Sequence, residues 1–319
     1  MTERDQRLAV TAPPPIRGGS TREADLPAGV TWPAVEATPS ESPFMQGLRR
    51  LRKSVTALVG LGIVVLLVVV AIFADVLAPH NPTTNDQMSM FLRPTWEHPL
   101  GTDHLGRDIL SRILHGGRIS LGVGLTAVTL SALIGVTLGL LAGFFGGRAD
   151  ALIMRIVDVF LAIPYILLAM GVVFALGPSL LNVILVMGAT RWVQFARIVR
   201  ADVLSIRERE FVAGARARGN RPLRLLLRHV LPNALTPIIV VATLELAFMI
   251  IYESALSFLG LGVQPPTPTW GWMLADGRNY VATAWWLATF PGLAIMLTVL
   301  AVNLLGDWLR DTLDPRLKV

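Results

Sequence analysis

The sequence contains no cysteine, and this absence excludes several classes of site. A chain without cysteine has no disulfide, no thiolate metal site and no cysteine nucleophile. The motif G-x-x-x-x-G-K-[ST] is also missing, so the chain has no P-loop with which to hold ATP. The motifs H-E-x-x-H and G-x-S-x-G do not occur either. We therefore expect no catalytic site, no cofactor and no metal in this chain.

Charged residues are scarce as well, because they make up 16% of the 319 residues and hydrophobic residues make up 53%. Soluble domains are about one quarter charged. The mean hydropathy is +0.59, and several apolar runs approach the roughly 20 residues that a helix needs to cross a bilayer. These features predict an all-α protein that crosses a membrane several times. Basic cytoplasmic loops account for the net charge of +6, so a nucleic-acid partner is not needed.

The N-terminal segment, residues 1–48, is rich in proline and polar residues and cannot bury a core. We expect it to be a disordered tail. It has no apolar core of the kind that a signal peptide requires. Arg49, Arg50, Arg52 and Lys53 follow directly before the first apolar run. Because positive charges beside the first span stay on the inner side, they place the N-terminus in the cytoplasm.

The remainder, residues 49–319, is expected to form one transmembrane domain with both termini in the cytoplasm of a cell whose inner (plasma) membrane it crosses. Six apolar runs predict the spans, which lie at about 55–77, 119–145, 156–176, 180–200, 235–261 and 284–305. The second run is rich in glycine and alanine, which favours close helix contact. Arg191 interrupts the fourth run, where we expect it to face protein or to reach the membrane surface.

The segment over 78–118 is polar and lies outside in this topology. Opposite charges alternate within it at Asp103, Arg107, Asp108 and Arg112, which predicts local ion pairs. The three histidines His98, His104 and His115 are six and eleven residues apart, so they do not share a helix face and predict no metal site. Five aromatic residues that follow the fifth run predict a belt at the outer membrane interface; they are Trp270, Trp272, Tyr280, Trp285 and Trp286.

The most informative stretch is the charged loop over 205–232. Ser205 and Glu208 have the spacing of a capping box, which predicts that a helix starts there. Gly219 with Asn220 predicts its end, and Pro222 predicts the first turn of a second helix. The first helix carries one large apolar residue, Phe211, beside several small ones. It can lie on lipid headgroups or accept a partner protein against its small side chains.

This loop resembles the EAA loop of ABC-importer permeases, whose pattern is E-A-A, three residues, Gly, nine residues and I-x-L-P. The pattern falls on residues 213–215, 219 and 229–232, with Ala213 in place of Glu, Gly214 in place of the first Ala and His229 in place of Ile. Two further strings, GTDHLGRDILSRI before the second span and ESALSFLGLG at the end of the fifth, resemble the C-type permeases of dipeptide and oligopeptide importers.

The resemblance implies a type I ABC-importer permease fold and a subunit that imports dipeptides or oligopeptides. It also implies a B-type permease, two ATPase subunits that bind the ATP and Mg²⁺, and an extracytoplasmic substrate-binding protein as partners, all within membrane lipid. In that family the loop docks into a groove on an ATPase. The positions that this implies for docking are Glu210, Phe211, Ala213, Gly214, Ala215, Arg216, Gly219, Leu231 and Pro232.

Other interpretations remain open. The same type of permease can carry nickel chelates or another small solute. A secondary transporter would use its own intramembrane charges, and an intramembrane enzyme would need a catalytic pair that the sequence lacks. Three acidic residues within the apolar runs are candidates for a translocation path, namely Asp158, Glu245 and Glu253. For Glu253 we weigh a structural hydrogen bond to another span against a place on the cavity between two permeases.

Overall fold

The structure is a computed structural model that describes residue 49 and residues 51–313. The expected tail over 1–48, the charge at Arg50 and the end of the chain over 314–319 lie outside the described residues. Within the described part the regular elements are helices, and the one β-bridge joins Thr102 to Asp108. The longer helices are α2 (Val55–Ile72), α4 (Ile109–Phe145), α5 (Gly147–Ala162), α6 (Tyr165–Leu176), α7 (Leu180–Ile206), α10 (Leu231–Phe258) and α12 (Trp286–Leu313).

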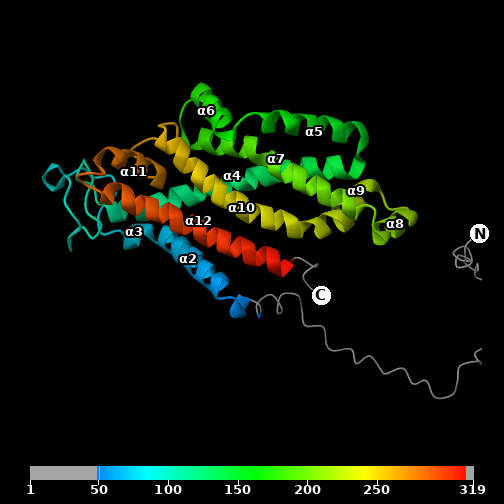
Figure 1. Cartoon of the computed structure of the whole chain (residues 1–319), viewed down its shortest axis with the longest axis horizontal. Coiled ribbons are helices and arrows are strands. Elements are labelled where there is room, and N and C mark those ends of the chain that lie inside the picture. Colours follow the sequence, from blue (N-terminus) through cyan, green and yellow to red (C-terminus); the bar gives the residue numbers. More distant parts are fainter. Residues whose placement is uncertain (1–48, 50, 314–319) are drawn as a thin grey trace, which may run out of the picture. The chain divides into compact units, whose positions relative to one another are not determined.

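Shorter elements connect them, and Figure 1 shows where they lie. They are α3 (Ala74–Leu77), the 3-10 helix η1 (Gln87–Ser89), α8 (Glu210–Ala217), α9 (Pro222–Leu225), the π-helix η2 (Leu226–Val230), α11 (Trp270–Gly277) and the 3-10 helix η3 (Arg278–Tyr280). Helix α8 lies at the opposite end of the helices from α11 and from the 78–108 segment in Figure 1. The loop over 205–232 and the polar segment over 78–118 are therefore far apart, as the topology from the sequence requires.

Four helices in the described residues are long and apolar enough to cross a membrane: α2, α4, the run Pro222–Phe258 and α12. Helix α2 exposes apolar side chains along most of its length, among them Val65, Leu66 and Ile72. Exposed apolar surface on this scale fits a helix that is solvated by lipid rather than by water. The all-helical membrane class predicted from the sequence is confirmed at this level.

The expected third span over 156–176 is not one straight helix. It comprises the second part of α5, from residue 156 to Ala162, and all of α6, and the two helices are bent by 91° relative to each other. The break falls at Pro164, which has no N–H to donate into a helix and disfavours helical geometry at Ile163 before it. Counted together, the two helices form either a fifth span or a loop that enters the membrane and returns on the same side.

The expected fourth span over 180–200 belongs to α7, which is not among the apolar helices. Charged side chains such as Arg191 and Arg197 lower its hydropathy. Helix α7 is instead packed along α4 and contacts α10. Buried residues on α7 include Met187, Phe195 and Val203, so much of this helix faces protein.

Small residues make the contact between α4 and α7 possible. A Cβ atom on Gly135 would lie 2.3 Å from the carbonyl oxygen of Trp192, and one on Gly139 would lie 2.8 Å from that of Ala196. The two backbones approach so closely that no larger residue fits. The close contact predicted from the glycine-rich second run is confirmed. Helix α4 begins at residue 109 rather than 119, because the carboxylate of Asp108 accepts from the Ser111 backbone N–H at 2.7 Å and caps it.

Candidate coupling surface and buried charges

Helix α8 begins later than the sequence predicts. The capping box at Ser205 and Glu208 does not form, because α7 continues through Ile206 and α8 starts at Glu210 without a side-chain cap. The end of the helix is as predicted, since Gly219 has a φ of +78° just after it. Pro222 is the first residue of α9, from which η2 and α10 continue. The predicted order of helix, break and second helix is therefore confirmed.

One side of α8 holds the helix to the rest of the chain. Val212 and Ala215, three residues apart, are each 0% exposed. Val212 packs in an apolar cluster with Val199 and Val203 of α7 and Val230 of η2. Leu231 packs against the same cluster from the start of α10. Both long helices that flank the loop therefore fix the orientation of α8.

The opposite side of α8 is open. Phe211 is 41% exposed, Ala213 and Gly214 are exposed, and a Cβ atom on Gly214 would meet nothing within 4 Å among the described residues outside its own helix backbone. Four further positions that the resemblance places in docking are exposed as well: Glu210, Arg216, Gly219 and Pro232. Ala215, which the resemblance also places in docking, does not lie on this exposed side, because each helical residue turns by about 100° and Ala215 faces inward with Val212.

Polar contacts reinforce the base of this loop. Arg207 Nη1 donates to the carbonyl oxygen of Gly143 at 2.8 Å, which ties the end of α7 to the end of α4. Arg200 Nη2 donates to Asp150 Oδ2 at 2.7 Å and joins α7 to α5. The helices that support α8 are therefore held together both by apolar packing and by hydrogen bonds from arginine side chains.

A buried ion pair lies farther along α7. Arg191 Nε and Nη2 donate to the two carboxylate oxygens of Glu245 on α10, at 2.9 and 2.6 Å. The guanidinium also lies 5.2 Å from the ring centroids of Tyr165 and Tyr252 and 5.8 Å from that of Phe248. Arg191 thus faces protein, which is one of the two outcomes predicted, and both charges are neutralised within the chain.

Glu253 makes a separate set of contacts. It is 0% exposed, and it accepts from Ser257 Oγ at 2.8 Å and from Ser120 Oγ of α4 at 3.3 Å. Ser120 Oγ in turn accepts from the backbone N–H of Trp270 at 3.3 Å. The carboxylate therefore joins α10 to α4 and, through Ser120, to α11. It is enclosed by its own chain and does not lie on an open surface in this structure.

The three acidic residues predicted for a translocation path are not brought together. Glu245 and Glu253 are both buried on α10, yet they have different partners. Asp158 is exposed on α5, and within the described residues no ion pair is found for it. The geometry thus groups Glu245 with Arg191, a pairing that needs the contact between α7 and α10 and has no signal in the sequence.

At the other end of the helices, ion pairs order the polar segment over 78–118 as the sequence predicts. Arg107 Nε donates to Asp103 Oδ2 at 2.7 Å, and Arg112 Nε lies 3.7 Å from the same oxygen. The residues that carry these pairs are not on one helix, because α4 starts only after Asp108. Asp75 also pairs with this region, because its Oδ1 lies 3.1 Å from His115 Nε2 and its Oδ2 lies 3.0 Å from Arg118 Nη1.

The predicted aromatic belt is largely wrong. Trp270 and Trp286 are each 2% exposed, and their indole N–H groups donate to the carbonyl oxygens of Ile113 at 2.9 Å and Thr102 at 3.1 Å. These side chains hold α11 and α12 against the start of α4 and the segment over 78–118. Of the five aromatic residues only Trp285, at 50% exposed, lies open on the surface.

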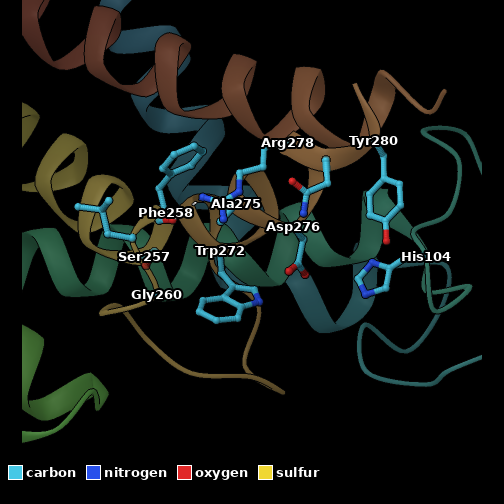
Figure 2. A pocket seen from close by; sticks show the side chains of 11 residues that line it. His104, Ser257, Phe258, Gly260, Trp272, Ala275, Asp276, Arg278 and Tyr280 are labelled. Atoms are coloured by element: carbon cyan, nitrogen blue, oxygen red, sulfur yellow. Dashed lines mark hydrogen bonds between the residues drawn. The ribbon is translucent and has the colours of Figure 1, made fainter. Parts of the chain in front are cut away.

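A pocket of about 480 Å³ lies between the end of α10 and α11. Figure 2 shows His104, Tyr280, Trp272, Asp276 and Arg278 around it. Burial raises the pKa of the Asp276 carboxyl, and the nearby charges of His104, Arg112 and Arg107 oppose that rise. The pocket thus offers groups of both charges beside aromatic rings. Sequence reasoning missed it, because its lining comes from three separate segments.

Comparisons with known proteins agree with this arrangement. The family model "Binding-protein-dependent transport system inner membrane component" matches residues 135–319, and "N-terminal TM domain of oligopeptide transport permease C" matches residues 42–94. The solved structure of the MetNI methionine ABC transporter in inward-facing conformations matches with a TM-score of 0.53 at 20% identity, over 64% of this chain and 97% of that chain. This likeness shows the fold.

Curated relatives are more similar in sequence. The di/tripeptide permease protein DppC of Pseudomonas aeruginosa is 45% identical over 87% of this chain and 93% of its own length. The dipeptide permease protein DppC of Alkalihalophilus pseudofirmus is 46% identical over 87% of this chain and 91% of its own length. The glutathione permease protein GsiD of Pectobacterium atrosepticum is 44% identical over 90% and 96%. The chain therefore belongs to the binding-protein-dependent transport system inner membrane components, and it is a multi-pass permease subunit of the DppC and OppC type rather than an enzyme.

Proposed function

We propose that this chain is the C-type permease subunit of an ATP-driven importer of short peptides. In this assembly it forms the translocation path with a B-type permease, receives substrate from an extracytoplasmic binding protein and is driven by two ATPase subunits, which bind the ATP and Mg²⁺. The proposal rests on the way in which α8 is exposed. Val212 and Ala215 are buried against the rest of the chain, while Phe211 and Gly214 are exposed. A helix held rigidly on one side and open on the other can transmit a push between subunits.

The docking surface follows from the same geometry. Phe211 is the large apolar residue on α8, and Ala213 and Gly214 leave space beside it for a partner side chain. Lipid headgroups would bind the basic residues of the loop without needing this gap. We therefore assign the exposed face of α8 to an ATPase groove. Exchange of Phe211 for Asp should abolish ATPase binding while leaving the permease pair intact, because Phe211 is not part of the cluster behind the helix.

Six membrane crossings with both termini in the cytoplasm complete the proposal. We count the bent pair α5–α6 as one crossing and α7 as another, since α7 packs against α4 and α10 and its Arg191 is buried and paired with Glu245 of α10. Because the chain has no cysteine, single introduced cysteines report topology cleanly. A membrane-impermeant maleimide on intact cells should label a cysteine at Trp96, which is fully exposed, but not one at Asn220. Labelling at position 220 from outside would refute this topology.

The cargo is tested by uptake. Named relatives carry dipeptides, D,D-dipeptides and glutathione, so the panel should contain all three together with a nickel chelate. Cells that lack the complex and regain it from a plasmid are expected to accumulate labelled dipeptide, and to stop when the ATPase subunits cannot hydrolyse ATP. Accumulation that persists with inactive ATPases would favour a secondary transporter instead. Uptake confined to the nickel chelate would keep the permease assignment and replace the peptide cargo.

A further inference from the structure

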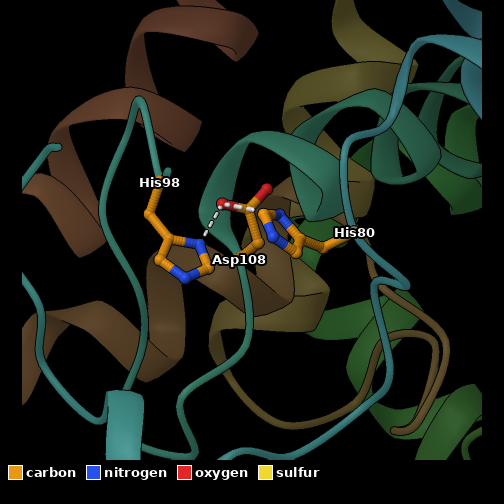
Figure 3. Close-up of side chains that lie close together, drawn as sticks. All are labelled: His80, His98 and Asp108. Atoms are coloured by element: carbon orange, nitrogen blue, oxygen red, sulfur yellow. Dashed lines mark hydrogen bonds and ion pairs between the residues drawn. The ribbon is translucent and has the colours of Figure 1, made fainter. Parts of the chain in front are cut away.

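Three side chains with metal-binding groups lie together in the segment over 78–118, which is outside in the proposed topology and is called the outer segment below. They lie away from the residues that the transport proposal uses. They are His80, His98 and Asp108, and their ligand atoms all lie within 4.8 Å of one another. Figure 3 shows both imidazole rings beside the Asp108 carboxylate. They come from the connection after α3, from the segment before α4 and from the N-cap of α4. The sequence gives no hint of this cluster, because the fold brings His80 next to His98.

The distances suit one metal ion. Asp108 Oδ1 lies 2.9 Å from His98 Nδ1 and 3.9 Å from His80 Nδ1. Zn²⁺ binds nitrogen and oxygen ligands at about 2.0–2.2 Å, which places neighbouring ligands of a tetrahedral site about 3.4 Å apart. The two distances lie on either side of that value. Small side-chain movements would therefore bring all three atoms onto one ion.

The hydrogen bond between His98 and Asp108 does not account for the position of His80. Its Nδ1 atom is buried, and among the described residues it has no hydrogen-bond partner. At 3.9 Å the carboxylate is too far away to accept from it. A buried polar nitrogen without a partner costs free energy, and a bound cation would remove that cost. The side chains of His98 and Asp108 are only 10% and 0% exposed, so the ligands are held in a shielded position.

The Asp108 carboxylate is also oriented by further hydrogen bonds, as carboxylates that bind metal ions usually are. Its second oxygen, Oδ2, accepts from both the backbone N–H and the Oγ of Ser111, each at 2.7 Å. Ser111 Oγ accepts in turn from the backbone N–H of His80 at 3.0 Å. Thus Oδ1 is left to the two histidines, while Oδ2 joins the segment at residue 80 to the start of α4.

We propose that His80, His98 and Asp108 bind one divalent transition-metal ion, with Zn²⁺ as the expected occupant. Two imidazoles and one carboxylate suit ions of the zinc and nickel class, whereas Mg²⁺ favours sites made of oxygen. A fourth position would face the exposed side of His80, whose side chain is 38% exposed, and would hold water. The ion would clamp the outer segment to α4. This site is independent of the cargo and of the ATPase contact.

The chain offers a matched control. His104 also belongs to the outer segment, and its buried Nδ1 atom likewise has no hydrogen-bond partner in the part of the chain that the structure describes. Its neighbour is the Tyr280 ring, at 5.8 Å between centroids, and it has no place in the cluster. If an unpartnered histidine nitrogen sufficed for metal binding, exchange of either histidine would have the same effect. The proposal requires that only the exchange of His80 or His98 weakens binding.

The experiment uses the full chain, purified in detergent without a polyhistidine tag and stripped with a chelator. Zn²⁺, Ni²⁺ and Mg²⁺ are titrated separately by calorimetry, and bound metal is counted by mass spectrometry after desalting. We expect one Zn²⁺ per chain, weaker or equal binding of Ni²⁺ and no binding of Mg²⁺. His80→Ala and His98→Ala should each weaken Zn²⁺ binding at least about tenfold, and His104→Ala should leave it unchanged.

A second readout separates metal binding from folding. Zn²⁺ should raise the melting temperature of the wild type and of His104→Ala but not that of His80→Ala, and all three should melt alike without metal. If His80→Ala does not elute as a monodisperse species, His80→Gln takes its place. Wild type that binds no stoichiometric Zn²⁺, or His80→Ala that binds it as tightly as wild type, would overturn the site. Either result would leave the permease assignment as it stands.

Discussion

Removal of one partner from the Arg191–Glu245 pair is the most direct test of how the helices are held together. Glu245→Gln keeps the shape of the side chain and one acceptor, but it leaves the guanidinium without a counter-ion inside the protein. Breaking a buried ion pair on one side costs about 3–5 kcal/mol. The three rings around the guanidinium stay in place in the variant, so their cation–π contacts act before and after the exchange and do not change the difference in stability. We therefore expect a loss of about 3–5 kcal/mol.

The double variant Arg191→Met/Glu245→Met supplies the decisive comparison. Replacing both charges with apolar side chains removes the unpaired charge, and such exchanges are often neutral or stabilising. The double variant should hence be more stable than Glu245→Gln alone. The assay is the recovery and melting temperature of the purified permease pair. Asp150→Asn breaks the Arg200 pair, whose side chains are 31% and 19% exposed, and should cost only about 0–1 kcal/mol. A Glu245→Gln protein as stable as wild type would refute the reasoning.

Three further predictions concern coupling, helix packing and Glu253. Gly214→Trp should leave the permease pair intact, because none of the described residues outside its own helix lies within 4 Å of the added Cβ, but should uncouple ATP hydrolysis from uptake; coupled uptake in this variant would contradict docking through this face. Gly139→Leu should lower the melting temperature by overpacking α4 against α7, a loss of about 1–3 kcal/mol or more, whereas Gly62→Leu faces open space and should not. Glu253→Gln should keep normal assembly and uptake, and Glu253→Leu should reduce complex yield, because Gln retains hydrogen bonds to the serines and Leu does not. Altered uptake with normal yield in both would instead indicate a charged path.

The sequence alone determined the class of protein and the place of the loop over 205–232. Membrane spans depend on runs of apolar residues, and these are local properties that can be read along the chain. The breaks at Gly219 and Pro222 are local as well, because one residue's backbone preference decides them. The glycine-rich second run likewise predicted a close helix contact, because small residues along one run can be recognised without knowing the fold. Even so, the start of α8 was misplaced, since the packing of Ile206 extended α7 past the expected cap.

Only the tertiary structure decided which side chains meet. Arg191 and Glu245 are 54 residues apart, and Ser120 and Glu253 are 133 apart, so no local pattern joins either pair. The same holds for the inward turn of Ala215, the burial of Trp270 and the meeting of His80 with His98. An apolar or aromatic residue in a membrane protein can face lipid, water or a neighbouring helix with the same sequence signal. The choice is made by the packing of helices against one another, where burial and the pairing of charges act over distances in space rather than along the chain.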